Sequence, residues 1–235
     1  MALPKLNEAP KYELTVPSTQ KKVKFRPFLV KEQKVLLIAH ESKDRRQMLN
    51  SMLDTVKACV EGEDIDNLTT YDIDYIFTNI RGKSVGEKVE MIFKCEECDH
   101  ENPYEINLDD VEVSKGESEK VVKLTDDISV KVKYPGYRNI LSNDKVLNMT
   151  SAGEAFIDLT MLCMESIMTN DQNILLKDEP REEVEKFIES MSAQQFQAIS
   201  DFVQKMPSMT YQAETKCTNC ESDIKRTLQG VDDFF

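Results

Sequence analysis

Apolar and polar residues alternate near the start of the chain. Apolar side chains recur at every second position on both sides of the polar turn PSTQKK, at Tyr12, Leu14, Val16, Val23 and Phe25. A period of two is typical of strands with one buried face. Two such runs around a polar turn predict a β-hairpin, in which the lysine-rich stretch KKVKFR forms a strand with a charged outer face.

The period then becomes helical. From Val30 to Val60 the chain has no Pro or Gly, and its apolar residues fall at helical intervals. We expect one long helix, or two helices joined near residues 41–45, ending by Gly62. Another helix is expected from Thr70, whose hydroxyl can cap free backbone N–H groups, to Gly82.

Beyond Gly86 the apolar residues again fall at every second position. This period predicts strands at 89–93, 104–108, 122–124 and 128–134. The acidic stretch DDVEVSKGESEK at 109–120 is typical of a solvated loop.

From about 137 to 206 the period is helical once more, and we expect three or four helices. One stripe consists of Phe156, Leu159, Cys163 and Ile167. A Ser-x-x-Gln capping box at Ser192 opens the last helix. After Pro207 short strands are expected around 211–213 and 224–228.

These elements predict an α+β protein in which helical segments flank a β-lobe. The expected segments are 1–84 with the hairpin and its helices, 85–135 as the β-lobe, 136–209 as a helical segment, and 210–235 returning to the β-lobe and ending in a tail. The tail ends in Phe234 and Phe235, which either pack back on the protein or contact a partner.

Composition and charge narrow the possible partners. The 43 Asp and Glu residues outnumber the 30 Lys and Arg residues, and the net charge is -13, which opposes binding to nucleic acid and to anionic membranes. No apolar run approaches the ~18–20 residues of a membrane span, and the first residues lack the pattern of a signal peptide. We therefore expect a cytoplasmic protein with protein partners.

Two Cys-x-x-Cys pairs are the strongest chemical signal. Cys95 and Cys98 lie in FKCEECDH, and Cys217 and Cys220 lie in TKCTNCES, with the intervening residues 99–216 between the pairs. Each pair joins two predicted strands, and we call such a turn a knuckle. Two facing knuckles supply four thiolates, which suit a structural Zn²⁺ ion in a zinc-ribbon-like site.

Other interpretations of the cysteines stay open. In one, the two pairs hold free thiols; in the other, a pair is a redox centre, although neither pair opens a helix as a thioredoxin-type centre does. We expect the acids beside Cys95 and Cys98 to raise the pKa of both thiols. We expect His100 to be a surface residue, and Cys59 and Cys163 to be core residues on helical stripes.

No catalytic motif is evident. The chain has two His residues and neither a P-loop nor a Gly-x-Gly-x-x-Gly motif. The acidic clusters at 64–66, 72–74 and 182–185 are typical of solvated helix faces. A zinc ion held by four cysteines keeps no open position for water. We therefore expect that the protein is not an enzyme.

Several stretches together resemble a known viral family. They are the YELTVPST strand, the strand-to-helix transition KVKFRPFLVKEQKVLL, the paired knuckles and the tail ending in Phe-Phe. With these features the chain resembles, nearly end to end, the baseplate hub and hub-assembly proteins of T4-like tailed bacteriophages. The resemblance implies a non-enzymatic role in building a contractile tail, as a virion component or as an assembly chaperone, with other hub and tail proteins as partners.

The main alternative is a zinc-ribbon adaptor that binds host transcription or another nucleic-acid machine. Such a protein needs a basic face, and the second knuckle offers the one candidate, with Lys216, Lys225 and Arg226.

Overall fold

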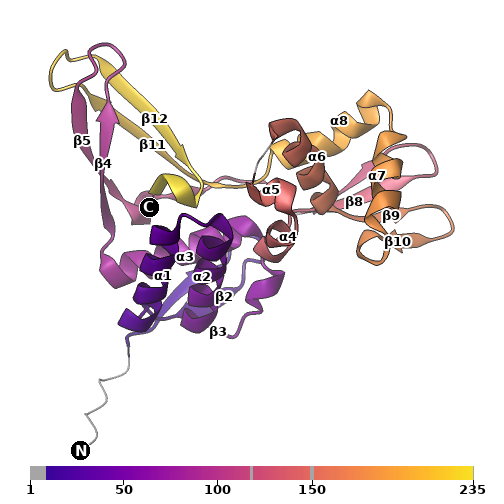
Figure 1. Cartoon of the computed structure of the whole chain (residues 1–235), viewed down its shortest axis with the longest axis horizontal. Helices are drawn as coiled ribbons and strands as arrows, with labels where there is room; N and C mark the ends of the chain where they lie inside the picture. The colour runs from indigo at the N-terminus through magenta and orange to yellow at the C-terminus, as the bar shows by residue number, and fades with distance from the viewer. Residues whose placement is uncertain (1–8, 117–118, 149–150, 235) are drawn as a thin grey trace, which may run out of the picture. The chain divides into compact units, whose positions relative to one another are not determined.

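The protein forms two compact units. The computed structural model describes residues 9–116, 119–148 and 151–234 (Figure 1). Unit 1 comprises Met1–Ile65, Tyr71–Ser114 and Ser208–Phe235, whereas unit 2 comprises Asp66–Thr70 and Lys115–Pro207. Most of unit 2 is therefore inserted in the sequence between two parts of unit 1.

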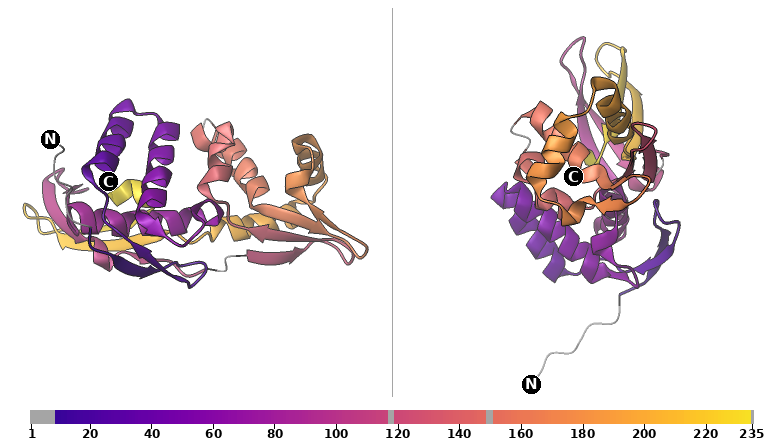
Figure 2. Two further views of the ribbon diagram at one scale, coloured as in Figure 1. Left: turned by 90° about the horizontal axis from the view of Figure 1, so that it is seen from below. Right: turned by 90° about the vertical axis from the view of Figure 1, so that its right-hand side faces the viewer.

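The first part of unit 1 combines a small antiparallel sheet with three helices. The strands are β1 (Tyr12–Thr15), β2 (Lys22–Phe25) and β3 (Val60–Glu61), in the order β1-β2-β3. The helices are α1 (Val30–Ser42), α2 (Arg45–Cys59) and α3 (Thr70–Val85), and they lie on one side of the sheet (Figure 2). The predicted hairpin is confirmed, and so is the expectation of two helices joined near 41–45.

One acidic cluster is buried, contrary to the expectation of a solvated helix face. Asp72 is 0% exposed in the first turn of α3. Its carboxylate accepts hydrogen bonds from the backbone N–H of Ser18 at 2.8 Å and from the Ser18 hydroxyl at 2.5 Å. These bonds replace water and attach the β1–β2 turn to α3, so Asp72 has a structural role.

The rest of unit 1 is built from two β-hairpins that lie side by side (Figure 1). The first pairs β4 (Lys88–Lys94) with β5 (Glu101–Asn107), and the second pairs β11 (Met209–Lys216) with β12 (Asp223–Gln229). The short strand β6 (Glu112–Val113) pairs with β11, so the predicted loop at 109–120 is wrong at this point. We call these two hairpins, together with β6, η2 (Leu108–Asp110) and the final helix η4 (Val231–Phe234), the knuckle lobe.

The knuckle lobe has its own apolar core. Its buried residues are Phe93, Cys95, Ile106, Leu108, Val111, Met209, Ala213, Cys217, Ile224, Leu228 and Phe234. Phe234 is 0% exposed, so this aromatic residue of the tail packs back on the protein. Phe235 lies outside the described residues.

Unit 2 is a four-stranded antiparallel sheet with helices. The strands are β7 (Glu119–Lys123), β8 (Ser129–Lys133), β9 (Met164–Met168) and β10 (Asn173–Leu175), in the order β10-β9-β8-β7. The helices are α4 (Tyr137–Leu141), α5 (Asp144–Asn148), α6 (Ala152–Cys163), α7 (Arg181–Glu189) and α8 (Ala193–Gln204). Residues 85–135, which we expected to form one β-lobe, thus contribute strands to different sheets.

Strand β9 corrects the expectation that 137–206 is entirely helical. Ile167, placed above on a helical stripe with Cys163, lies on β9 opposite Val130 of β8. No Pro or Gly separates α6 from β9, and a short apolar run fits both periods. Residues 164–168 form a strand rather than a helix because they pair with β8, and the local sequence does not reveal this pairing.

The smaller expectations on cysteines and caps are confirmed. Cys59 and Cys163 end α2 and α6 and are 1% and 0% exposed. Ser192 caps α8 through the predicted box with Gln195.

Among the described residues, no helix is both long and apolar enough to span a membrane.

Candidate metal centre

The two knuckles have the same backbone geometry. In each, the N–H of the first cysteine donates to the carbonyl five residues later, at 2.9 Å in the first knuckle and 2.8 Å in the second. Its carbonyl accepts from the N–H four residues later, at 3.0 and 2.9 Å. That fourth residue is Asp99 or Glu221, with φ of 56° and 60°. Two segments far apart in the sequence therefore form the same turn, including its left-handed residue.

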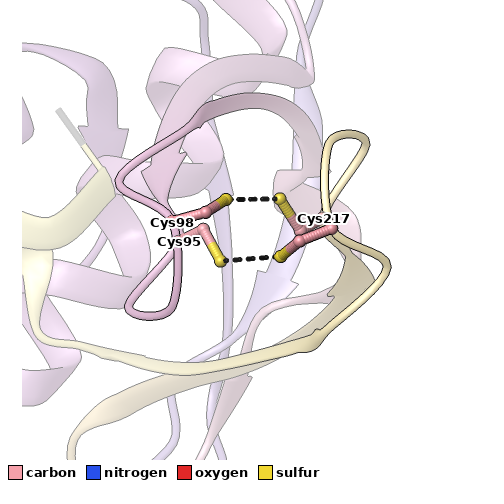
Figure 3. A group of neighbouring side chains, drawn as sticks. Cys95, Cys98 and Cys217 are labelled. Atoms are coloured by element: carbon pink, nitrogen blue, oxygen red, sulfur yellow. Dashed lines mark hydrogen bonds between the residues drawn. The ribbon is translucent and has the colours of Figure 1, made fainter.

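The knuckles face each other and bring four sulfur atoms together. The Sγ atoms of Cys95, Cys98, Cys217 and Cys220 all lie within 4.8 Å of one another. Sulfurs pair across the gap, Cys95 with Cys220 at 3.7 Å and Cys98 with Cys217 at 3.6 Å (Figure 3). A tetrahedral zinc centre with bonds of about 2.3 Å places its sulfurs about 3.8 Å apart. The arrangement is thus compatible with a metal site.

The surroundings of the four sulfurs differ. Cys95 and Cys217 are buried, whereas Cys98 is half-buried and Cys220 is exposed. Burial alone raises the pKa of Cys217, but the N–H groups of Asn219 and Cys220 outweigh it and lower that pKa to about 6. Favouring the thiolate in this way suits a metal ligand, because thiolates are the species that bind zinc.

The thiols of the first knuckle shift in opposite directions. A hydrogen bond from Ser222 lowers the pKa of Cys95, so the expectation that neighbouring acids raise it is wrong. For Cys98, hydrogen bonds from the Asn219 side chain and the His100 backbone lower the pKa, but burial and the sulfurs of Cys220 and Cys217 outweigh them and raise it to about 11. The two thiols of one knuckle therefore differ in how readily they lose a proton.

Asn102 links the two knuckles and was not found from the sequence. This β5 residue is 2% exposed, and its carbonyl oxygen accepts from the Thr218 N–H at 2.8 Å and from the Thr218 hydroxyl at 3.0 Å. Its NH₂ group donates to the His100 carbonyl at 3.0 Å and to the Cys217 sulfur at 3.6 Å. The one signal in the sequence for this role is a polar residue at a strand position opposite the apolar Phe93, where a buried side chain is expected.

Ser222 is a second contact that the sequence did not reveal. Its hydroxyl lies 3.1 Å from the sulfur of Cys95 and 3.1 Å from that of Cys220. Such outer contacts orient the sulfurs and tune their charge. His100, by contrast, is exposed as expected and contributes its backbone carbonyl.

Two of the three basic residues at the second knuckle pair with carboxylates, which opposes the basic face that a nucleic-acid adaptor needs. Arg226 donates to Glu96 at 2.5 Å, and Lys225 donates to Glu214 at 3.1 Å. The Arg226–Glu96 pair also crosses from one hairpin to the other. Since these cations face carboxylates in an acidic lobe, the alternative function gains no support from the geometry.

Comparisons with known proteins agree with the resemblance described above. Residues 9–235 match the model of a family described as "T4 bacteriophage base plate protein". No curated protein and no solved structure matches the chain.

Proposed function

The chain belongs to the T4 bacteriophage base plate protein family, and on this premise we propose that it is a structural or assembly component of the baseplate hub of a contractile tail. The match over 9–235 carries this proposal. The family is structural rather than enzymatic, so the chain acts by binding other phage tail proteins.

Zinc is the metal that the four-sulfur site suits best. Cys95, Cys98, Cys217 and Cys220 would hold one Zn²⁺ ion, and support comes from the matched knuckles and from the spacing of the sulfurs. Four protein ligands leave no position for a reacting water, so the ion supplies a crosslink. It would join two hairpins that are distant in sequence and couple metal binding to the folding of the knuckle lobe.

Helix α1 offers a surface for protein binding. Among the large apolar residues of this helix, Val30, Val35, Leu37 and Ile38 are 78%, 48%, 57% and 49% exposed. The surrounding stretch 21–46 carries nine Lys and Arg residues against three Asp and Glu residues, in a chain of net charge -13. An acidic, apolar surface of another tail protein complements this combination.

The role in the tail can be tested in an infected host. Deleting the gene should leave phage heads without complete tails, and replacing Leu37→Glu in α1 should do the same while the purified protein stays folded. Complete tails in the deletion strain would contradict the proposal. Mass spectrometry of mature particles then separates a virion component from a chaperone that acts in the host cytoplasm and leaves.

The metal can be tested separately on the purified protein. Elemental analysis should find about one zinc ion per chain. Cys95→Ser and Cys217→Ser should lose it, whereas Cys59→Ala, which removes a buried cysteine outside the knuckle lobe, should keep it. A metal-free protein with four titratable knuckle thiols, after growth with added zinc, would contradict a zinc site.

A further inference from the structure

Strand β7 lies at an open edge of the unit 2 sheet. In the order β10-β9-β8-β7, and within the residues that the structure describes, β7 pairs only with β8. The Leu124 N–H donates to the Ile128 carbonyl at 2.9 Å. Leu124 and Ile128 thus form a hydrogen-bonded pair, and such pairs alternate with non-hydrogen-bonded pairs along an antiparallel ladder. The N–H and C=O groups of Val122 therefore point toward β8, whereas those of Val121 and Lys123 point outward, away from the sheet.

A groove of about 610 Å³ lies beside this edge. Its buried apolar lining comes from Val122 of β7 and from Tyr134 and Phe202, and the exposed Val121 lines the groove as well. The two rings are stacked with centroids 4.2 Å apart, and the Tyr134 hydroxyl donates to the Phe202 carbonyl at 3.0 Å. Helix α8 lines the groove with Ala198, Asp201 and Phe202, and Lys205, which directly follows the helix, lines it too. Stacked aromatic side chains thus form part of the groove's lining.

Lysines surround the groove. They are Lys115, Lys120, Lys123 and Lys205, and the acidic residue that lines the same groove is Asp201. Lys123 pairs with Asp126 at 2.8 Å on the exposed surface. In the described parts of the chain, no carboxylate lies within ion-pair distance of Lys115, Lys120 or Lys205. This excess of positive charge stands out in a chain of net charge -13.

We propose that the β7 edge and its groove bind an extended acidic segment of a partner protein, which adds a strand to the sheet. The outward peptide groups of Val121 and Lys123 would supply main-chain hydrogen bonds, the groove would receive apolar side chains, and the lysines would attract Asp and Glu. The proposal goes beyond the proposed function, because it concerns unit 2, which contains none of the four knuckle cysteines.

The probe is a fluorescent eight-residue peptide of alternating Glu and Val, titrated into the full-length protein. Lys120→Glu should weaken binding about tenfold or more, because it reverses a charge at the groove. Lys177→Glu is the matched control. It makes the same charge change in the 3₁₀-helix that follows β10, at the opposite edge of the sheet, and should leave the affinity within about twofold.

Strand pairing is tested apart from charge. Val121→Pro removes an outward N–H and leaves the ladder to β8 intact, so it should weaken binding about two- to tenfold. If that variant does not fold, the same peptide with N-methyl groups at alternate amides tests the same bonds against the unchanged protein, and it should bind equally weakly.

Three results would overturn the proposal. The first is the absence of peptide binding at low salt. The second is binding that is insensitive both to Lys120→Glu and to N-methylation. The third is binding that responds to charge alone, as a general polyanion site does. Zinc content and the tail phenotype are measured independently of peptide binding, so this proposal and the proposed function can fail separately.

Discussion

The knuckle lobe and unit 2 are stabilised in different ways. The knuckle lobe contains two hairpins that lie on either side of residues 115–207 in the sequence, and its core residues include two of the four converging cysteines. Unit 2 has a four-stranded sheet covered by helices, with a buried aromatic stack between Tyr134 and Phe202. An isolated hairpin is marginally stable in water, whereas a sheet covered by helices is not.

This difference predicts which part of the molecule would depend on the proposed zinc ion. In the knuckle lobe, the sulfurs, Asn102 and the Arg226–Glu96 pair all join one hairpin to the other. In unit 2, apolar contacts between neighbouring elements supply the stability. A crosslink is most useful where it joins sequence-distant segments with a small shared core.

Metal removal should have the largest effect and should be confined to unit 1. Zinc binding to small structural sites is worth about 10–16 kcal/mol, so a chelator should open the two hairpins. Hydrogen-exchange mass spectrometry should show rapid exchange in β11 and β12 and unchanged protection in β8 and α8. Equal loss of protection in both units would show that the two regions do not differ in this way.

Phe202→Ala should produce the reverse pattern. Removing one ring of the buried stack should destabilise unit 2 by about 3–5 kcal/mol. Thermal unfolding should show the loss, while zinc content stays at the wild-type level. Phe196→Ala, on the same helix but only half-buried, is the control and should cost less. Loss of zinc in Phe202→Ala would contradict the independence of the two regions.

Asn102→Ala should weaken the knuckle lobe by a smaller amount. It leaves the Thr218 N–H without its acceptor and removes the donor to the Cys217 sulfur, a cost of about 1–3 kcal/mol. Competition with a zinc-binding dye should show a lower zinc affinity. Asn50→Ala removes an amide that bonds Arg46 within α2, and its zinc affinity should match that of the unchanged protein.

Glu221→Gly should have the smallest effect on stability, and it should stabilise the protein rather than destabilise it. A left-handed residue with a side chain costs about 1–2 kcal/mol, and glycine removes that strain at some cost in chain entropy. The net gain should be below about 1 kcal/mol. Asp99→Gly should gain less, because Asp tolerates this conformation better and pairs with Lys94 at 3.1 Å. Chemical denaturation of the zinc-loaded protein measures the free energy of unfolding of both variants. A loss of stability in Glu221→Gly would contradict the claim that the backbone at Glu221 is strained.

Local patterns were sufficient to predict most helices and hairpins. The β1–β2 hairpin, the start of α3 at Thr70 and the capping box at Ser192 each depend on residues close in sequence. The convergence of the knuckles was also predictable, because both cysteine pairs lie between alternating strands. These features follow from periodicity and capping, which act over a few residues.

Features that depend on distant partners were not predictable. β9 is a strand because β8 pairs with it, and Asp72 is buried because Ser18 approaches it from another element. Asn102 has a role only because Thr218 folds against it. In each case one residue's environment is decided by a segment more than 30 residues away, which no local period records.

The insertion of unit 2 between the hairpins has a consequence for synthesis on the ribosome. Cys217 follows Cys98 by 119 residues. At about 5–20 residues per second, that corresponds to a delay of about 6–24 s. During this time the nascent first hairpin exposes Phe93, Ile106 and two thiols to oxidants and to other unfinished chains, while unit 2 can already fold. Slow translation should therefore lower the yield of correctly assembled protein, and coexpressed chaperones should restore it.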